Sequence, residues 1–374
     1  MNTSYPSYKK KTKLAIIHEF FNQIGGAERI FKEVFMVLYP DAHIFTLFYD
    51  PERFIFDQRS KITTSFLQYF TFIKNHKLYL PFMPFAIKTF NFKNYELILS
   101  SSHNLAKNIR KPKHSLHICY CHTPMRYAWE LREQYIQDQF LFLRLPLRIF
   151  LTLLALWDKR NARSVDYFIA NSENVRRRIK KYYNRDATVI YPAVDCKKFI
   201  PGERKDDFYL VVSRLIKPKR INLVIEAFRN LDMHLYIIGT GSEEKSLKKL
   251  ALPNVHFLGY LPEDQLIAYY QRAKALIFPG IEDFGMTPLE AQACGTPVIA
   301  FGKGGALETI IEGKTGHFFH KQTPEAITDA ILAFEKLSFN PKDCRKQALR
   351  FDIAHFRRNL KRFIDETRRK HHVL

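Results

Sequence analysis

The stretch "EDFGMTPLEAQACGTPVIA" (Glu282–Ala300) contains the local signals that decide the fold of its surroundings. Thr287 is a favourable N-cap, and Pro288 suits the first helical position, where a missing N–H costs nothing. Gly295 suits the residue just past a helix end. The apolar run Val298–Ala300 then has the character of a buried strand. The stretch therefore predicts a loop, a helix of about two turns, a second loop and a strand.

Two glutamates in this stretch have different explanations. Thr287 and Glu290 have the spacing of a capping box, in which the glutamate only closes the start of the helix. Glu282 precedes the predicted cap and has no helical role. Gly285 leaves the backbone open to close approach just before the helix, where free N–H groups form an anion site. The stretch is thus explained either by helix capping or by ligand binding.

The composition limits the class of protein. The chain has 374 residues, enough for two domains of ordinary size, and its hydrophobic fraction of 46% excludes global disorder. The five cysteines are odd in number and scattered, and no signal peptide is evident, so we expect reduced thiols in a cytosolic setting. The net charge is +22, with basic clusters at "KKKTK" (Lys9–Lys13) and "RRRIKK" (Arg176–Lys181). This charge favours a nucleic acid, an anionic membrane or a phosphate-bearing substrate as partner.

One segment, "FLFLRLPLRIFLTLLALW" (Phe140–Trp157), is very apolar but contains Arg144, Pro146 and Arg148. Its uninterrupted part, Ile149–Trp157, is far shorter than the ~20 residues of a membrane-spanning helix. It is either a buried helix of the first domain or a basic amphipathic helix that lies on a bilayer. The basic clusters favour the bilayer slightly.

Short apolar runs alternate with helical patterns along the chain. The runs that we expect to be strands are "KLAIIHEF", "YELILSSS", "HSLHICYCH", "DYFIANS" and "ATVIYPAVD", followed by "FYLVVSRL", "HLYIIGTG", "VHFLGYL", "ALIFPG" and "PVIAFG". The polar stretch Lys197–Asp207 separates the two groups and is interpreted as a linker. We therefore predict an α/β protein with two facing, doubly wound parallel-sheet domains. Ligands of such sheets bind beyond the carboxyl ends of the strands.

Glycines and cations follow two of the predicted strands. Gly25 and Gly26 lie at a strand-to-helix turn, which either admits a ligand to the backbone amides or is a plain tight turn. The dinucleotide fingerprint G-x-G-x-x-G is absent there. Arg214 and Lys219 follow the first strand of the second domain. They either converge on a diphosphate or remain solvated surface cations.

His122 follows another predicted strand and is close in sequence to Cys119 and Cys121. In a strand, residues 119 and 121 point to one face and residue 122 to the other. The C-x₂₋₄-C spacing of zinc sites is also missing. We therefore predict no metal site. His122 is either a core imidazole or a functional group at a strand exit.

Together these motifs resemble family 4 of the retaining glycosyltransferases (GT4), which have the GT-B fold of two facing Rossmann-like domains with a cleft between them. "EDFGMTPLE" matches the E-x(7)-E element of that family, and other matching segments cover nearly the whole chain in the family's order. They are the Gly-Gly loop, "HTPMRY", "ANS…VIYPAVD", "SRLIKPKRINLVIEAF", "GTGSEEKSLKKLA", "VHFLGYL", "FPGIEDFGMTPLEAQACGTPVIAFGKGGALETI" and "GKTGHFF". The "KR" after Lys217-Pro218 and "EDFG" with "EAQACGTPVIA" are most similar to mannosyltransferases of bacterial surface-polysaccharide (O-antigen) assembly.

The resemblance implies a division of the chain. Residues 1–200 would form the acceptor-binding domain, and residues 207–350 the nucleotide-sugar-binding domain. Residues 351–374 would form a helix that crosses back to the first domain. One position departs from the pattern: many relatives have glycine after the diphosphate lysine, where this chain has Arg220. That departure suits the mannosyl subgroup but blurs the assignment of the donor.

The resemblance also implies roles for single residues. Arg214 and Lys219 would hold the diphosphate, and Glu290 would bind the ribose hydroxyls. Glu282 would face the donor sugar, as a nucleophile or as a positioning and electrostatic group, and His122 would lie near the anomeric centre. The catalytic residues expected are thus His122 and Glu282. The donor-binding residues expected are Gly25, Gly26, Ser213, Arg214, Lys219, Gly239, Leu261, Asp283, Phe284, Gly285, Met286, Thr287 and Glu290.

The resemblance implies a nucleotide-sugar as substrate and neither a cofactor nor a metal. GDP-mannose is the favoured donor, and a lipid-linked oligosaccharide the expected acceptor, at the inner face of the cytoplasmic membrane. A UDP-sugar donor, a GT-B nucleotide-sugar epimerase and a basic nucleic-acid-binding protein are the alternatives. The intact Glu282–Glu290 pair and the absence of RNA-binding motifs argue against the last of these.

Overall fold

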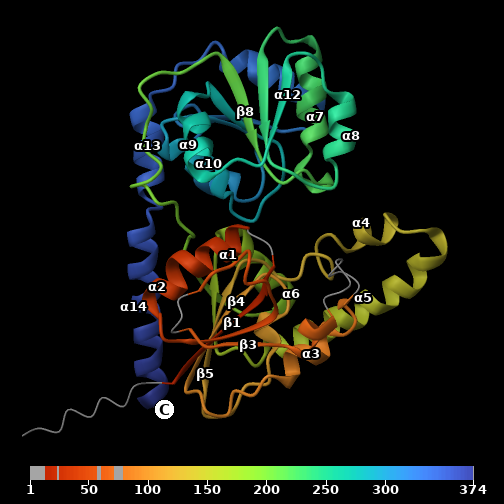
Figure 1. Cartoon of the computed structure of the whole chain (residues 1–374), viewed down its shortest axis with the longest axis vertical. Coiled ribbons are helices and arrows are strands. Elements are labelled where there is room, and N and C mark those ends of the chain that lie inside the picture. Colours follow the sequence, from red (N-terminus) through yellow and green to blue (C-terminus); the bar gives the residue numbers. More distant parts are fainter. Residues whose placement is uncertain (1–12, 23–24, 57–59, 71–78, 374) are drawn as a thin grey trace, which may run out of the picture. The chain divides into compact units, whose positions relative to one another are not determined.

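A computed structural model describes residues 13–22, 25–56, 60–70 and 79–373 (Figure 1). The basic cluster Lys9–Lys13 therefore lies almost entirely outside the described residues. The chain divides into two compact units, which we describe separately. Unit 1 contains Met1–Asn171, Val175–Val189 and Leu360–Leu374, and unit 2 contains Ser172–Asn174 and Ile190–Asn359.

The described residues of unit 1 form a seven-stranded parallel sheet in the order β3-β2-β1-β4-β5-β6-β7. The strands are β1 (Leu14–Phe21), β2 (His43–Tyr49), β3 (Ile62–Thr64), β4 (Leu97–Ser102), β5 (Leu116–Cys121), β6 (Tyr167–Ala170) and β7 (Ala187–Val189). The strand order reverses between β1 and β4, which is the position where ligands bind in doubly wound sheets. His18 on β1 pairs in register with Ser101 on β4 at this reversal.

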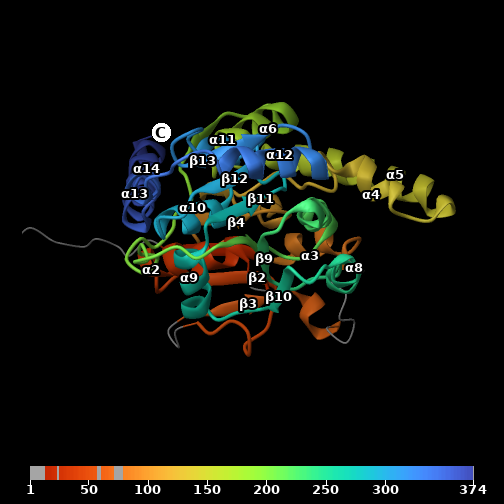
Figure 2. The same ribbon diagram turned by 90° about the horizontal axis from the view of Figure 1, so that it is seen from above.

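Helices cover both faces of the unit 1 sheet. They are α1 (Gly26–Ile30), a π-helical turn (Phe31–Phe35), α2 (Met36–Leu38), α3 (Met83–Thr89), α4 (Arg132–Gln137), α5 (Leu141–Ala162) and α6 (Glu173–Tyr183). α3 and α5 pack in one apolar cluster with β1 and β4, whereas α6 packs in another with Cys119 and Cys121 of β5. All five cysteines are buried, free thiols. The first turns of α5 extend away from the sheet together with α4 (Figures 1 and 2).

Unit 2 contains a six-stranded parallel sheet in the order β10-β9-β8-β11-β12-β13. The strands are β8 (Phe208–Val212), β9 (His234–Ile238), β10 (Val255–Gly259), β11 (Ala275–Phe278), β12 (Val298–Phe301) and β13 (Gly316–Phe319). Here the order reverses between β8 and β11. The sequence thus correctly predicted two doubly wound parallel sheets, which is the architecture of the GT-B fold, while the facing arrangement and the cleft stay predictions.

Side chains alternate between the two faces of the unit 2 sheet. On β8, Tyr209 and Val211 pack with α7 (Ile221–Ala227) and α12 (Pro324–Phe334), whereas Phe208 and Leu210 pack with α9 (Glu263–Arg272) and α10 (Met286–Ala293). Figure 1 shows these two pairs of helices on opposite sides of β8. Full burial of an aliphatic side chain, such as that of Leu210, contributes about 1.5–3 kcal/mol to folding. The helices are α7 (Ile221–Ala227), α8 (Glu244–Leu250), α9 (Glu263–Arg272), α10 (Met286–Ala293), α11 (Ala306–Thr309), α12 (Pro324–Phe334) and α13 (Pro341–Leu349).

Two segments lie near the boundaries between the units in the sequence. The stretch that we interpreted as a linker groups with unit 2, where Phe199 is fully buried beside Tyr270. The last helix, α14 (Ile353–Val373), begins among residues of unit 2 and ends among residues of unit 1. In the described part of the chain, the helices are either too short or too polar to cross a bilayer.

Candidate active site

Most of the predicted donor-binding residues of unit 2 follow two neighbouring strands, β8 and β11. β8 and β11 are paired central strands, and the strand order reverses between them. Their carboxyl ends lie at the same end of the sheet. Ser213 and Arg214 follow β8, and Glu282 lies in the loop between β11 and α10. The carboxyl ends of parallel strands meet at one sheet edge, so the fold brings these two loops together.

Lys219 and Glu282 form an ion pair between these two loops. The Lys219 ammonium contacts Glu282 Oε1, and each side chain is about a fifth exposed. The loops also approach through their backbones, because a Cβ atom at Gly280 would lie 3.3 Å from Lys219 Cα. Arg220, which follows Lys219, has a φ of 56°. That left-handed conformation favours glycine, which explains physically why a glycine suits this position in similar sequences.

Other predicted donor-binding residues shape the same edge of unit 2. Gly239 has a φ of 132°, and a Cβ atom there would lie only 1.9 Å from the carbonyl oxygen of Ser213. This position therefore requires glycine. Arg214 is exposed, and its carbonyl accepts a hydrogen bond from Ser213 Oγ at 3.1 Å. Leu261 is partly buried against the core of unit 2.

The glycines after β12 contact the backbone of the loop that contains Glu282. Gly305 N donates to the Glu282 carbonyl at 3.0 Å. A Cβ atom at Gly305 would lie 2.1 Å from the carbonyl oxygen of Phe284, so glycine is needed for this close approach. Phe284 itself is buried and stacks on Tyr191 at a centroid distance of 5.5 Å. These contacts fix the backbone on either side of Asp283.

The predicted cap of α10 is wrong. The helix begins at Met286 with Gly285 as its N-cap, at a φ of 101°, so Thr287 is the second helical residue. The capping box that Thr287 would have formed with Glu290 is therefore not built. Glu290 is instead buried, and its Oε2 accepts a hydrogen bond from Tyr270 O–H at 2.8 Å. The predicted helix end was correct, because Gly295 follows the helix at a φ of 73°.

In unit 1, Gly25 and Gly26 lie at the start of α1. Gly25 is the N-cap, and Arg29 N donates to its carbonyl at 3.0 Å. A Cβ atom at Gly25 would lie 2.7 Å from Glu28 Oε2, so the glycine leaves room for that carboxylate. Gln23 and Ile24, which precede the glycines, lie outside the described residues.

His122 lies just beyond β5 and belongs to a buried polar network that the sequence analysis missed. Its Nε2 is 2.9 Å from Ser101 Oγ, and Ser101 Oγ is 3.1 Å from His18 Nδ1. His18 Nε2 in turn lies 3.4 Å from Glu28 Oε1. The missed signal was the polar pair His18-Glu19 inside a run that otherwise has the pattern of a fully buried strand.

Glu19 is the most completely paired member of this network. Its Oε1 accepts from Ser102 Oγ at 2.8 Å and from two backbone amides, and its Oε2 lies 3.2 Å from His103 Nδ1. Burial alone would raise the pKa of Glu19. The positive charges of His103 and His18 and the donated hydrogen bonds outweigh burial and lower that pKa to about 2. Glu19 is therefore ionised at neutral pH.

Two imidazoles and a carboxylate of this network could in principle hold a metal ion, because ligand atoms of His18, Glu28 and His103 lie within 4.8 Å of one another. Each of them already has a close partner: His18 Nε2 lies 3.4 Å from Glu28 Oε1, and His103 Nδ1 lies 3.2 Å from Glu19 Oε2. We therefore interpret the group as an ion-pair network.

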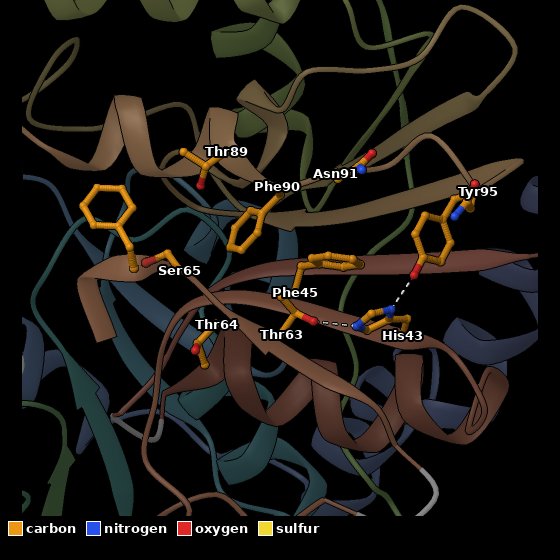
Figure 3. A pocket seen from close by; sticks show the side chains of 11 residues that line it. His43, Phe45, Thr63, Thr64, Ser65, Thr89, Phe90, Asn91 and Tyr95 are labelled. Carbon is orange, nitrogen blue, oxygen red and sulfur yellow. Dashed lines mark hydrogen bonds between the residues drawn. The ribbon is translucent and has the colours of Figure 1, made fainter. Parts of the chain in front are cut away.

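A separate cavity lies on unit 1 and contains none of the predicted site residues (Figure 3). Its volume is about 350 Å³, and it is lined by residues of β2, β3 and the segment around Tyr95. His43 contacts Tyr95 O–H through Nδ1 and Thr63 Oγ1 through Nε2, as Figure 3 shows. Both ring nitrogens are thus engaged within the cavity wall, so we assign His43 a structural role.

Comparison with known proteins identifies the family. The model described as "Glycosyl transferases group 1" matches residues 195–351, and the model described as "Glycosyltransferase Family 4" matches residues 24–198. Together they span most of the chain.

Individual proteins are similar at lower identity. An uncharacterized glycosyltransferase of Methanocaldococcus jannaschii is 28% identical over 172 residues, which are 45% of this chain and about half (49%) of that relative. Alpha-1,3/1,6-mannosyltransferase ALG2 of Dictyostelium discoideum is 24% identical over 91% of this chain and 93% of its own length. The structure of sucrose-phosphate synthase from Thermosynechococcus elongatus superimposes with a TM-score of 0.76 at 18% identity, covering 96% of this chain and 99% of that one. The superposition shows that the chain has the GT-B fold. From the two family matches we conclude that the chain belongs to family 4 of the glycosyltransferases, which are retaining hexosyltransferases.

Proposed function

We propose that this chain transfers mannose from GDP-mannose to a lipid-linked oligosaccharide in surface-polysaccharide assembly. The observation that carries the proposal is the contact between Lys219 and Glu282 at the ends of β8 and β11. This contact supports the proposal, because a departing diphosphate would need a cation and its sugar a carboxylate. The choice of mannose is supported by the Dictyostelium discoideum relative, whose name is that of a mannosyltransferase.

In this proposal, Lys219 and Arg214 bind the diphosphate of the donor. The two cations stabilise the negative charge that develops on the departing nucleotide, so the reaction needs no divalent metal and no cofactor. In the free protein Lys219 is paired with Glu282, so an arriving diphosphate competes with Glu282 for the ammonium group. Donor binding then frees the Glu282 carboxylate to turn toward the sugar.

The loop between β11 and α10 would hold the rest of the donor. The backbone amides of Asp283–Thr287 lie at the start of α10, where N–H groups favour anionic and hydroxyl oxygens. Glu290 would bind the ribose hydroxyls alongside Tyr270, because a carboxylate has several acceptor positions. Ser213, Gly239 and Leu261 would complete the donor site, and Gly25 and Gly26 would contact the phosphates from unit 1.

The proposed reaction occurs on one face of the sugar. The bond between the anomeric carbon and the phosphate oxygen breaks, and the acceptor hydroxyl attacks the same face and passes its proton to the departing phosphate. Glu282 would stabilise the oxocarbenium-like charge and hold sugar hydroxyls. His122 would donate a hydrogen bond near the anomeric centre.

A transfer assay tests this function. We expect purified protein, GDP-mannose and a lipid-linked acceptor to give GDP and a product whose new linkage has the α configuration of the donor, by NMR of the anomeric proton. Transfer from UDP-sugars alone would overturn the donor assignment. Donor consumption without acceptor, with release of free sugar and nucleotide, would instead support the epimerase alternative.

We also propose that α4 and α5 bring the enzyme to the inner face of the cytoplasmic membrane. The first half of α5 is apolar and exposed: Phe142 is 75% exposed and Leu145 67%. The first buried residue of this helix is Leu151, nearly three turns from its start at Leu141. An apolar surface of this kind on a free protein in water is unfavourable unless something covers it.

The positive charge of the protein favours an anionic bilayer as the partner of this surface. Arg144 and Arg148 lie among the exposed apolar residues, and the whole chain carries a net charge of +22. Apolar residues enter the acyl boundary while arginine side chains reach the headgroups. The predicted buried-helix interpretation applies only to the second half of α5, where Leu151, Leu154 and Ala155 are buried. A lipid-linked acceptor would meet the enzyme at the same surface.

Vesicle co-sedimentation tests the membrane surface. Leu145→Glu should lower the partition coefficient for anionic vesicles at least tenfold, because about 1.5–3 kcal/mol of apolar burial is lost. Leu332→Glu is the matched control, since Leu332 on α12 is also exposed (44%) and should leave vesicle binding unchanged. Wild-type binding should weaken as salt rises. Equal binding by both variants, or conversion of a dimer to a monomer by Leu145→Glu without loss of vesicle binding, would contradict the proposal.

A further inference from the structure

Four polar side chains of unit 1 form a hydrogen-bonded chain that ends at His122. Glu28 on α1 faces His18 on β1, His18 contacts Ser101 on β4, and Ser101 contacts His122 after β5. All four residues are buried, with exposures of 8% for His122, 2% for Glu28 and zero for the two between them. In such a chain the possible positions of each hydrogen are limited by what each neighbour can donate or accept.

The protons on His18 follow from its two neighbours. Its Nδ1 lies 2.9 Å from the carbonyl oxygen of Ser101. A carbonyl oxygen can only accept, so Nδ1 carries a hydrogen. Its Nε2 faces Glu28, which also accepts when ionised, so the imidazole carries a second hydrogen and is a cation. Burial alone would lower the pKa of His18, but the hydrogen bond from His18 to Glu28 and the charges of Glu28 and Glu19 raise it.

The proton on Ser101 then determines the tautomer of His122. Ser101 Oγ already faces the Nδ1–H of His18 at 3.1 Å, where it can only accept. The Ser101 hydroxyl therefore donates its hydrogen to His122 Nε2, which lies 2.9 Å from Ser101 Oγ. A buried hydroxyl without an acceptor would cost about 1–3 kcal/mol, which favours this arrangement over the reverse one. His122 Nε2 is therefore an acceptor, and the single ring hydrogen of a neutral His122 lies on Nδ1.

We propose that the chain Glu28–His18–Ser101 is a positioning device that holds His122 as the neutral Nδ1–H tautomer, so that its Nδ1 is a hydrogen-bond donor for a substrate oxygen. Glu28, His18 and Ser101 act through His122 and are positioning residues. Their importance for transfer rests on the proposed function, but the tautomer itself is a property of the free protein. Gly25 of the double-glycine turn has a role in this device, because the absence of a side chain there leaves space for the Glu28 carboxylate.

The surroundings keep His122 neutral over the physiological range. The groups that face it are His18 and Glu19 on β1, Glu28 on α1, Ser101 on β4, His103 after β4 and Tyr120 on β5. Burial, and then repulsion from His103 and His18, lower the pKa of His122 to about 3, although Glu19 and Glu28 act in the opposite direction. The tautomer should therefore not change between pH 6 and 8.

The tautomer can be read directly from ¹⁵N NMR of histidine-labelled full-length protein without ligand. We expect two inequivalent ring nitrogens for His122, with Nδ1 protonated and Nε2 bare, and a doubly protonated ring for His18. The His122 signals are identified by their loss in His122→Gln. A His122 that is protonated on Nε2, a His18 that is neutral at pH 7, or a zinc titration that shifts both His18 and His103 would overturn the proposal.

A matched pair of variants tests the role of the serine. Ser101→Ala should turn His122 into a mixture of tautomers and lower kcat for hexose transfer roughly three- to tenfold, the value of one hydrogen bond. Ser100→Ala removes the same hydroxyl from the neighbouring position, where Ser100 Oγ lies 2.9 Å from His117 Nε2. It should change the signals of His117 and leave His122 and kcat unaltered. Equal His122 signals in the wild type and Ser101→Ala would contradict the proposal.

The two readouts separate this proposal from the proposed function. If the NMR pattern is found but the wild type transfers no hexose, the positioning chain exists and the proposed function is wrong. If transfer occurs and Ser101→Ala changes the tautomer without changing kcat, the proposed function stands and the device does not serve catalysis.

Discussion

Replacing Glu282 by glutamine is expected to lower kcat for hexose transfer by about 100- to 1,000-fold, the usual loss when one electrostatic contact to a transition state is removed. The substitution keeps the shape of the side chain and removes only its charge. Glu282 and Lys219 are each about a fifth exposed, and a glutamine carbonyl oxygen can still accept a hydrogen bond from the Lys219 ammonium. The Gly305 N–H that holds the loop donates to the Glu282 backbone carbonyl, which the substitution leaves in place.

The measurement is kcat at saturating donor and acceptor, together with the midpoint of thermal unfolding. Glu312→Gln is a matched control, because Glu312 is an exposed glutamate of the same unit whose carboxylate contacts His317. It should change neither quantity appreciably. A Glu282→Gln protein that unfolds at a much lower temperature but retains its turnover when folded would show that Glu282 is structural.

The sequence predicted the sheets well because their pattern depends on local chemistry. Runs such as "FYLVVSRL" are apolar on both faces, and in the structure Tyr209 and Leu210 are buried on opposite sides of β8. A short continuous apolar run bounded by polar or turn residues has few alternatives to a buried parallel strand.

The start of α10 was predicted incorrectly because its cause is not local. Residue type favours Thr287 as the cap, but the structure uses Gly285, whose φ of 101° turns the chain into the helix two residues earlier. The approach of Gly304 and Gly305 to the Glu282 loop fixes that turn. Those residues are adjacent only in the folded protein, so no local pattern contains the information.

The polar network around His122 was missed for the same reason. His122 was singled out from its place after a strand, but its partners come from β1, β4 and α1. The register of β1 against β4 brings His18 beside Ser101, and register is a property of the assembled sheet. Buried charge within a predicted core strand, as in His18-Glu19, is the signal that could have identified the network beforehand.

The second large effect is expected for the cations that would hold the diphosphate. Lys219→Ala should weaken GDP-mannose binding by about 1.5–3 kcal/mol, or roughly 10- to 150-fold, the value of a hydrogen bond to a charged group. Arg214→Ala should have an effect of similar size. Both effects should shrink as the salt concentration rises, because the two side chains are accessible to solvent.

The neighbouring Lys217 provides the control for Lys219. Lys217 and Lys219 lie at the two ends of the same short helical turn, and Lys217 is the more exposed of the two. The Lys219 ammonium contacts the Glu282 carboxylate. Lys217→Ala removes an equal charge from the same loop, so it reports any non-specific loss of positive potential.

Calorimetric titration of GDP-mannose into the wild type, Lys219→Ala and Lys217→Ala tests most directly whether the β8 and β11 loops of unit 2 hold a sugar diphosphate. We predict saturable binding by the wild type, a loss of at least tenfold in affinity for Lys219→Ala, and an unchanged dissociation constant for Lys217→Ala. Equal affinity of all three proteins for GDP-mannose would contradict the assignment of the diphosphate site.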